Sequence, residues 1–141
     1  MRALWTRGGL TIVAAIAVSA VLATAAGAKL AASWQLVDDH QSACFSSNVT
    51  SSYYGIWISG RWRHTIDVGA KAMPAGGSFS TSDAPIAPGS STGEYSLAYV
   101  RVQIPAATPV GSYTAKLWAS DGTHRQTVPI TLNVQDRCGG Y

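Results

Sequence analysis

The feature that most constrains the fold is a two-residue alternation of apolar and polar side chains in the C-terminal half of the chain. Three runs show it: Tyr95–Ile104, Ser112–Ala119 and Arg125–Val134. A period of two places every second side chain on one face, so each run predicts a half-buried β-strand. No stretch after residue 28 has the periodicity of a helix of useful length. The sequence therefore predicts an all-β domain, with these inward positions: Ala98, Val100, Val102 and Ile104; Tyr113, Ala115, Leu117 and Ala119; Val128, Ile130, Leu132 and Val134.

Turn signals and shorter runs predict the rest of the sheet structure. Ser120–Thr123 contains the Asp-Gly pair that is typical of a tight hairpin turn. Pro129 lies on the outer side of its strand, where a missing N–H favours an edge position. Three short strands are expected, two of them around an Asp38–His40 turn and one inside a Gly/Pro/Ser-rich stretch; they are Trp34–Val37, Ala43–Ser46 and Ser78–Ser82.

A hairpin is expected in the middle of the chain. Tyr53–Trp57 would run into an Ile58-Ser59-Gly60 loop with Gly60 in the left-handed conformation, and Arg61–Val68 would run back. This register places Tyr54, Ile56, Trp62, His64, Ile66 and Val68 inside. A two-residue Ser59-Gly60 turn is the alternative, and it would reverse the faces of the first strand. His64 on an apolar face is interpreted as a core histidine.

The N-terminus reads as a cleaved signal peptide, residues 1–28. Arg2 and Arg7 precede an uncharged apolar stretch, and Ala26-Gly27-Ala28 supplies the small residues of a cleavage site. Cleavage after Ala25 is an alternative, and an uncleaved membrane anchor is another, because the uncharged stretch is long enough to span a bilayer. We expect a secreted, extracellular protein without stable membrane insertion after cleavage. Residues 29–141 would then form one domain with an N-terminal extension, residues 29–52.

Charge and cysteine content narrow the class of protein further. The mature chain keeps eight of the ten basic residues against seven acidic ones, and this near balance argues against a nucleic-acid partner. Cys44 and Cys138 form an even pair in an exported chain, which predicts one disulfide. A metal site is the weaker reading, because two cysteines so far apart lack the spacing of a zinc site.

Several segments resemble a known kind of module. They are Met73-Pro74-Ala75-Gly76, Ile86-Ala87-Pro88-Gly89-Ser90, the Val100–Ile104 strand end with Pro105, Pro109-Val110-Gly111-Ser112-Tyr113, Asp121-Gly122 and the final Val128–Val134 strand. From about Arg61 to Val134 the chain is similar to bacterial immunoglobulin-like accessory modules that occur beside glycoside hydrolase and sugar-binding domains. The whole chain also looks like small exported proteins of high-GC bacteria that carry only a domain-of-unknown-function label.

The resemblance implies an immunoglobulin-like antiparallel β-sandwich of about seven strands. It gives Tyr113 a structural role, as the tyrosine corner whose hydroxyl bonds back to upstream backbone. The Lys29–Ser52 segment, which carries Cys44, lies outside the module pattern. No catalytic residue is carried over, because such modules are non-catalytic.

Reactive side chains give no pattern for catalysis. The chain has no Gly-x-Ser-x-Gly nucleophile elbow, and Glu94 is its only glutamate. His40 and His124 lie in turn-like contexts. Asp38-Asp39-His40 is a weak candidate for a cation site, since adjacent acids point in different directions. We therefore expect no enzyme activity, no cofactor and no metal.

One surface is the candidate binding face. If the strands Tyr53–Trp57, Arg61–Val68 and Tyr95–Ile104 share a sheet, their outer sides carry Tyr53, Trp57, Arg61, Arg63, Leu97, Tyr99 and Arg101. Aromatic rings with flanking donors suit a glycan, an aromatic ligand or an extracellular protein, although arginine–tryptophan stacking alone would explain them. Trp118 beside Lys116 is a second, smaller candidate. The sequence favours an exported binding or structural protein of unknown ligand; a carbohydrate-binding module, a secreted enzyme inhibitor and a small-ligand carrier are alternatives.

Overall fold

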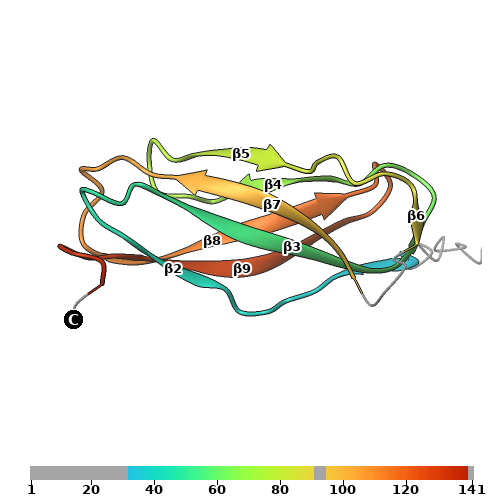
Figure 1. The fold of residues 1–141 in the computed structure, drawn as a ribbon, viewed down its shortest axis with the longest axis horizontal. Helices are drawn as coiled ribbons and strands as arrows, with labels where there is room; N and C mark the ends of the chain where they lie inside the picture. Colours follow the sequence, from blue (N-terminus) through green and yellow to red (C-terminus); the bar gives the residue numbers. More distant parts are fainter. Residues whose placement is uncertain (1–31, 91–94, 140–141) are drawn as a thin grey trace, which may run out of the picture. The chain divides into compact units, whose positions relative to one another are not determined.

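The computed structural model describes residues 32–90 and 95–139, and these fold into β-strands without a helix. Nine strands follow one another along this part of the chain: β1 (Trp34–Leu36), β2 (Ser42–Phe45), β3 (Ser51–Trp62), β4 (Asp67–Lys71), β5 (Ser78–Ser82), β6 (Gly89–Ser90), β7 (Ser96–Gln103), β8 (Gly111–Ser120) and β9 (Arg125–Val134) (Figure 1). The predicted signal peptide, residues 1–28, lies outside the described residues. The described residues contain no helix that is long and apolar enough to cross a membrane.

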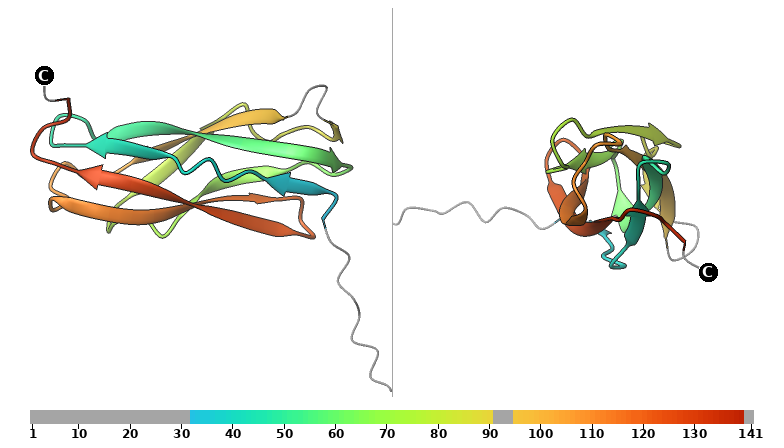
Figure 2. Two further views of the ribbon diagram at one scale, coloured as in Figure 1. Left: turned by 90° about the horizontal axis from the view of Figure 1, so that it is seen from below. Right: turned by 90° about the vertical axis from the view of Figure 1, so that its left-hand side faces the viewer.

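The strands form two sheets that pack face to face (Figure 2). One sheet has the order β1-β3-β7-β5, with β6 paired to the end of β3, and the other has the order β2-β9-β8-β4. All pairs are antiparallel except β2 with β9. This is the strand order of an immunoglobulin sandwich, in which the first strand changes sheets halfway along. The predicted fold class is therefore confirmed, and the expected N-terminal extension supplies the edge strands β1 and β2.

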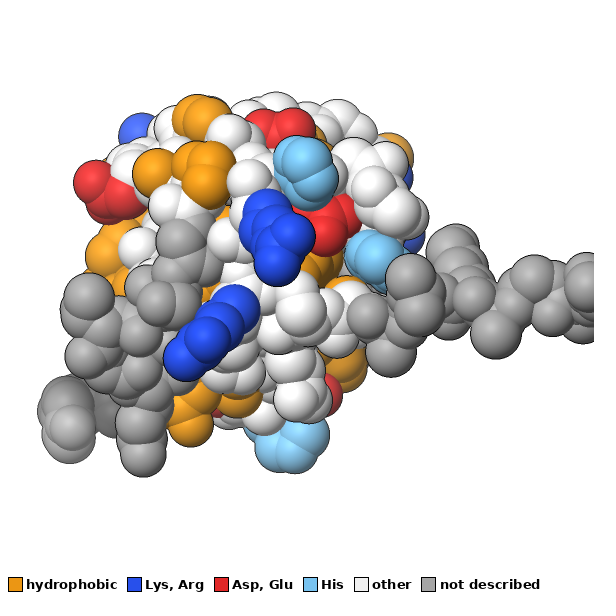
Figure 3. Space-filling view, turned by 90° about the vertical axis from the view of Figure 1, so that its right-hand side faces the viewer, with side chains coloured by type: hydrophobic (Ala, Val, Ile, Leu, Met, Phe, Trp, Pro, Cys, Tyr) orange, Lys and Arg blue, Asp and Glu red, His pale blue; other side chains and the backbone are white. Residues whose placement is uncertain are grey.

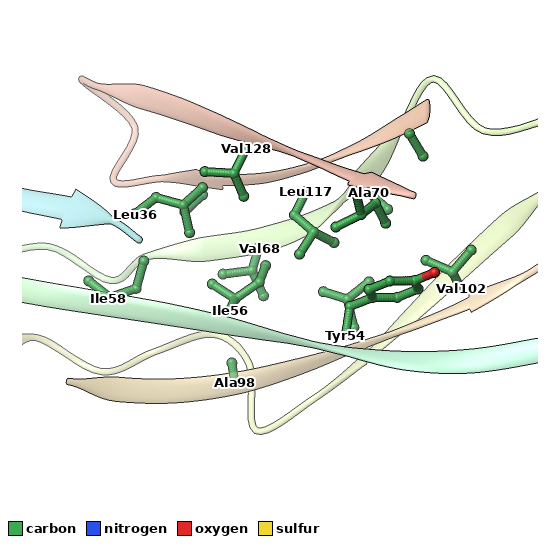
Figure 4. Close-up of a cluster of buried hydrophobic side chains, with 14 of the residues drawn as sticks. Leu36, Tyr54, Ile56, Ile58, Val68, Ala70, Ala98, Val102, Leu117 and Val128 are labelled. Carbon is green, nitrogen blue, oxygen red and sulfur yellow. The ribbon is translucent and has the colours of Figure 1, made fainter. Parts of the chain in front are cut away.

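The core lies between the sheets and contains the alternating side chains of the C-terminal strands (Figure 4). Every inward position predicted in β7, β8 and β9 is buried, except Tyr113, which is half-buried. Tyr54 is fully buried, and its hydroxyl donates a hydrogen bond to the Thr131 carbonyl across the sandwich. Burial raises the pKa of Tyr54. β2 pairs with β9 from Thr131 onward, and Pro129 comes before that point. The missing N–H of Pro129 therefore costs no ladder hydrogen bond on the β2 side of the strand.

The predicted central hairpin is wrong. Residues 51–62 form one continuous strand, β3, and the chain then crosses to the other sheet to form β4. Tyr54, Ile56, Ile58 and Trp62 are all buried, so the inward alternation continues straight through the expected loop. β1 pairs antiparallel with this segment and holds it extended. As a result, His64 lies exposed after the end of β3 and is not a core histidine.

Two further predicted features, a disulfide and a tyrosine corner, are present. Cys44 in β2 and Cys138 after β9 form the expected disulfide, with the two Cα atoms 5.7 Å apart. The Tyr113 hydroxyl donates a hydrogen bond of 2.8 Å to the Pro109 carbonyl, which is the geometry of a tyrosine corner. The importance of this bond for stability stays a prediction.

The β8–β9 turn is tied to β1 through a carboxylate. The indole Nε1 of Trp34 donates to Asp121 Oδ2 at 2.7 Å, and the backbone N–H groups of Thr123 and His124 donate to Oδ1 at 2.9 and 2.6 Å. Only 11% of the Asp121 side chain is exposed. This burial raises the pKa of Asp121, but the donated hydrogen bonds outweigh it and lower the pKa from 3.8 to about 2.

This lowered pKa predicts acid sensitivity. The carboxyl of Asp121 is more acidic in the folded chain than in the unfolded chain, so its contribution is complete above about pH 4 and is lost as the pH falls to about 2. We expect it to be worth about 1–2 kcal/mol. Urea denaturation of the wild type and the Asp121→Asn variant at pH 6 and pH 2.5 measures the difference. An equal loss of stability in both proteins would contradict this role of Asp121.

Candidate functional site

The outer face of the β1-β3-β7-β5 sheet carries four of the six predicted site residues close together. Tyr53 is directly opposite Arg101 in the β3–β7 ladder, Tyr99 is opposite Gly55, and Trp57 follows two residues further along β3. Tyr53 is 62% exposed and Tyr99 is 41% exposed. The Arg101 guanidinium lies 5.9 Å from the centroid of the Tyr53 ring and also donates to Ser51 Oγ. These four residues form one outward surface of two neighbouring strands.

Arg61 and Arg63 do not join this surface. Arg61 is eight residues from Tyr53 along an extended strand, or roughly 26 Å, and it pairs with Ser90 of β6. Arg63 lies after the end of β3. Both are exposed. Figure 3 shows one end of the sandwich, on which basic, acidic and histidine side chains gather. The predicted face is therefore shorter than expected.

A groove at Trp57 adds residues that were not in the predicted face. Val37, Asp39, Trp57 and Tyr95 line a cavity of about 320 Å³. Trp57 and Tyr95 meet edge to face, with ring centroids 6.1 Å apart and planes at 83°. Tyr95 directly precedes β7 and is 46% exposed, whereas Val37 and Asp39 belong to the connection between β1 and β2. We name these four residues the Trp57 groove.

Gly55 provides the surface on which the groove is built. A Cβ atom at Gly55 would lie 2.9 Å from Trp57 Nε1 and 3.2 Å from Leu97 Cδ1, so the indole folds back over the bare backbone. Glycine inside a strand marks such close approach. Trp34 and Trp62 donate their indole N–H groups to Asp121 and to the Ala87 carbonyl, but Trp57 Nε1 has no acceptor among the described residues.

The wall of the groove is fixed by a glutamine side chain. Gln41 Nε2 donates to the Gly55 carbonyl at 2.6 Å, and Gln41 Oε1 accepts from the Gly55 N–H at 2.7 Å, as a neighbouring strand would. The same Nε2 donates to Asp39 Oδ1 at 2.7 Å. The Val37 N–H also donates to the Trp57 carbonyl. The β1–β2 connection is thus held against β3 with Asp39 at the groove. Asp39 Oδ2 makes no hydrogen bond with any described residue.

The groups in the Trp57 groove are of a kind that can form hydrogen bonds and ring contacts with a ligand. The groove offers an open indole N–H donor, a carboxylate acceptor and two aromatic rings at right angles, but it holds no nucleophile beside a base. Across residues 32–90 and 95–139, no three His, Cys, Asp or Glu side chains are grouped to hold a metal ion. Asp38 and His40 contact each other at 3.1 Å at the protein surface.

Trp118, the second candidate binding residue predicted from the sequence, lies on the outer face of the β2-β9-β8-β4 sheet. Trp118 is half-buried between Phe79, which meets it edge to face at 6.5 Å, and Arg125, whose guanidinium lies 4.2 Å from its ring centroid. Phe79 comes from β5 of the opposite sheet and reaches over Gly69 of β4, where a Cβ atom would lie 2.7 Å from both rings. The ring of Trp118 is therefore largely occupied by its own neighbours.

Comparisons with known proteins identify a family and similar solved structures. Residues 35–136 match a family of unknown function, DUF5980, and the chain belongs to this family. No curated protein matches the sequence. Among solved structures, a chimeric titin Z1Z2 carrying a peptide from decorin is similar over 73% of this chain and 48% of its own, with 19% identity and a TM-score of 0.44. Domains 4 and 5 of the S-layer protein SbsC are similar over 72% of this chain and 44% of their own, with 16% identity and a TM-score of 0.41.

The chain thus spans about half the length of either structure. At this level of identity, these likenesses concern the fold alone.

Proposed function

We propose that this protein is an exported, non-catalytic binding module that holds its ligand in the Trp57 groove and along the adjoining Tyr53–Tyr99–Arg101 surface. The observation that carries the proposal is the open indole N–H of Trp57, which lies in a groove beside a second ring and a carboxylate. Export from a bacterial cell is part of the proposal. It is supported by the signal-like sequence of residues 1–28 and by the disulfide, which is compatible with an oxidising compartment.

The chemistry of the groove favours a saccharide as the ligand. The C–H face of a sugar ring packs on flat aromatic rings, while its hydroxyl groups both accept and donate hydrogen bonds. Trp57 Nε1 would donate to one hydroxyl, and the free oxygen of Asp39 would accept from another. Tyr53, Tyr99 and Arg101 extend the same face along β3 and β7, which provides contacts for further sugar units. An extended aromatic surface with few charges suits a neutral chain.

An array of neutral oligosaccharides, followed by isothermal titration of the bound ones, tests this function. We expect Trp57→Ala to lower the affinity at least tenfold, because a ring and a hydrogen-bond donor are both removed. Trp118→Ala removes the same side chain from the other sheet and is the matched control, which should keep the affinity. Thermal denaturation confirms that both variants fold.

Two results would contradict the proposal. An array on which no neutral saccharide binds would exclude the proposed ligand class. A bound saccharide whose affinity falls with Trp118→Ala, but not with Trp57→Ala, would place the site on the other sheet.

A further inference from the structure

The outer face of the β2-β9-β8-β4 sheet carries three cations that form no salt bridge with any described residue. Lys71 of β4 and Lys116 of β8 are directly opposite each other in the ladder, and Arg125 of β9 lies on the same face. All three are exposed. Among the described residues, no carboxylate lies within 4.0 Å of their charged groups, and none of the three side chains makes a hydrogen bond. We name these three residues the cationic face.

This arrangement works against stability. Like charges directly opposite each other in an antiparallel pair repel, with Cβ atoms about 5 Å apart. Asp67, on the same side of β4, is opposite Ser120, which is in turn opposite Arg125. Asp67 is therefore two strands, or roughly 10 Å, from Arg125 and further from the lysine pair. A ligand that carries negative charge would relieve the repulsion.

The centre of the face is rigid. Arg125 is stacked on Trp118, Trp118 is held at its edge by Phe79, and Gly69 leaves the space into which both rings fit. A guanidinium stacked on a ring keeps its N–H edge free for an oxyanion, and less side-chain freedom is lost when it binds. Arg125 and Lys116 are separated by about four residues along the ladder, or roughly 13 Å, so anionic groups must be spread along the ligand.

We propose that the cationic face binds an extended anionic polysaccharide, through its charged substituents rather than through its rings. The face has little apolar area for a protein partner, since Phe79 is the only exposed large hydrophobic side chain that contacts it within residues 32–90 and 95–139. Single-stranded nucleic acid needs open rings on which bases stack, and Arg125 covers Trp118. A flat polar face with spaced cations fits a charged sugar chain.

Titration of the protein with dextran sulfate and with uncharged dextran of the same length tests this inference. We expect dextran sulfate to bind at low salt, dextran not to bind through this face, and the affinity to fall steeply as salt is added. The double variant Lys71→Ser, Lys116→Ser should lose at least tenfold in affinity for dextran sulfate, and its affinity should depend less on salt.

The matched control removes the same charge elsewhere. Arg61→Ser, Arg63→Ser also lowers the net charge by two, at the end of β3, and should keep most of the affinity. Equal losses in the two double variants would overturn the proposal, because net charge alone would then explain binding. Tighter binding of polyglutamate or oligo-dT than of dextran sulfate would assign the face to another class of polyanion and overturn it too. Because Trp57→Ala should leave this binding unchanged, the outcome is independent of the Trp57 groove.

Discussion

Replacing both cysteines by serine is expected to lower the free energy of unfolding by about 2–5 kcal/mol. Cys44 and Cys138 are 94 residues apart, and the loss of conformational entropy in an unfolded chain closed over such a loop corresponds to about 4–5 kcal/mol. The bond also holds β2, a four-residue edge strand that pairs with no described strand other than β9. Guanidinium denaturation of the wild type and the Cys44→Ser, Cys138→Ser variant measures the loss.

The reduced wild-type protein is the control for this experiment. It should unfold at nearly the same denaturant concentration as the double variant, because both lack the bond but keep a side chain of similar size. A change of less than 1 kcal/mol in the double variant would show that the packing of β2 and β9 closes the domain without help from the disulfide.

The C-terminal strands were predictable because their signals are local. In β7, β8 and β9, the alternation of side chains, the prolines and the Asp-Gly turn are all contained in a few neighbouring residues. β5 and β9 have the predicted bounds, Ser78–Ser82 and Arg125–Val134. The pairing of these strands into a sandwich follows from burying one face of each.

The course of β3 could not be read in the same way. Ile58-Ser59-Gly60 has the composition of a hairpin loop, and the choice between a turn and a continuous strand depends on β1, which is distant in sequence. The predicted left-handed conformation of Gly60 is present, with a φ of 89°, but it lies inside a strand. The left-handed backbone of Gly60 was thus predicted correctly, but the hairpin turn inferred from it was wrong.

The candidate site was likewise predictable only where the signals were local in sequence. Alternation placed Tyr53, Trp57, Tyr99 and Arg101 on one face, and the β3–β7 register brings them together. Sharing a face does not imply proximity on a strand of 12 residues, which is why Arg61 is distant. Tyr95 and Asp39 reach the groove from outside the strands, so alternation could not find them. Gly55 was the available signal, because glycine inside an apolar strand marks a close approach.

Gly60→Ala is expected to destabilise the protein by about 2–4 kcal/mol. A left-handed conformation costs a residue with a Cβ atom about 1–2 kcal/mol. In addition, that Cβ would lie 2.5 Å from the Ser33 carbonyl oxygen and 3.1 Å from Trp34 Cα, so β1 must move away. The same oxygen accepts the Arg61 N–H at 3.0 Å, and this bond between β1 and β3 would be lost. Urea denaturation at neutral pH measures the total.

Gly122→Ala is the matched control, since it isolates the conformational part of this cost. Gly122 in the β8–β9 turn has nearly the same φ, 87°, but a Cβ there would meet nothing within 4 Å. Gly122→Ala should therefore cost only the conformational part, about 1–2 kcal/mol, and the difference between the two variants reports the contact between Gly60 and β1. Equal losses would mean that β1 yields freely at this position. A loss about twice as large at Gly60 would show that the backbone of β1 is fixed against β3, at the start of the connection that carries Val37 and Asp39 to the Trp57 groove.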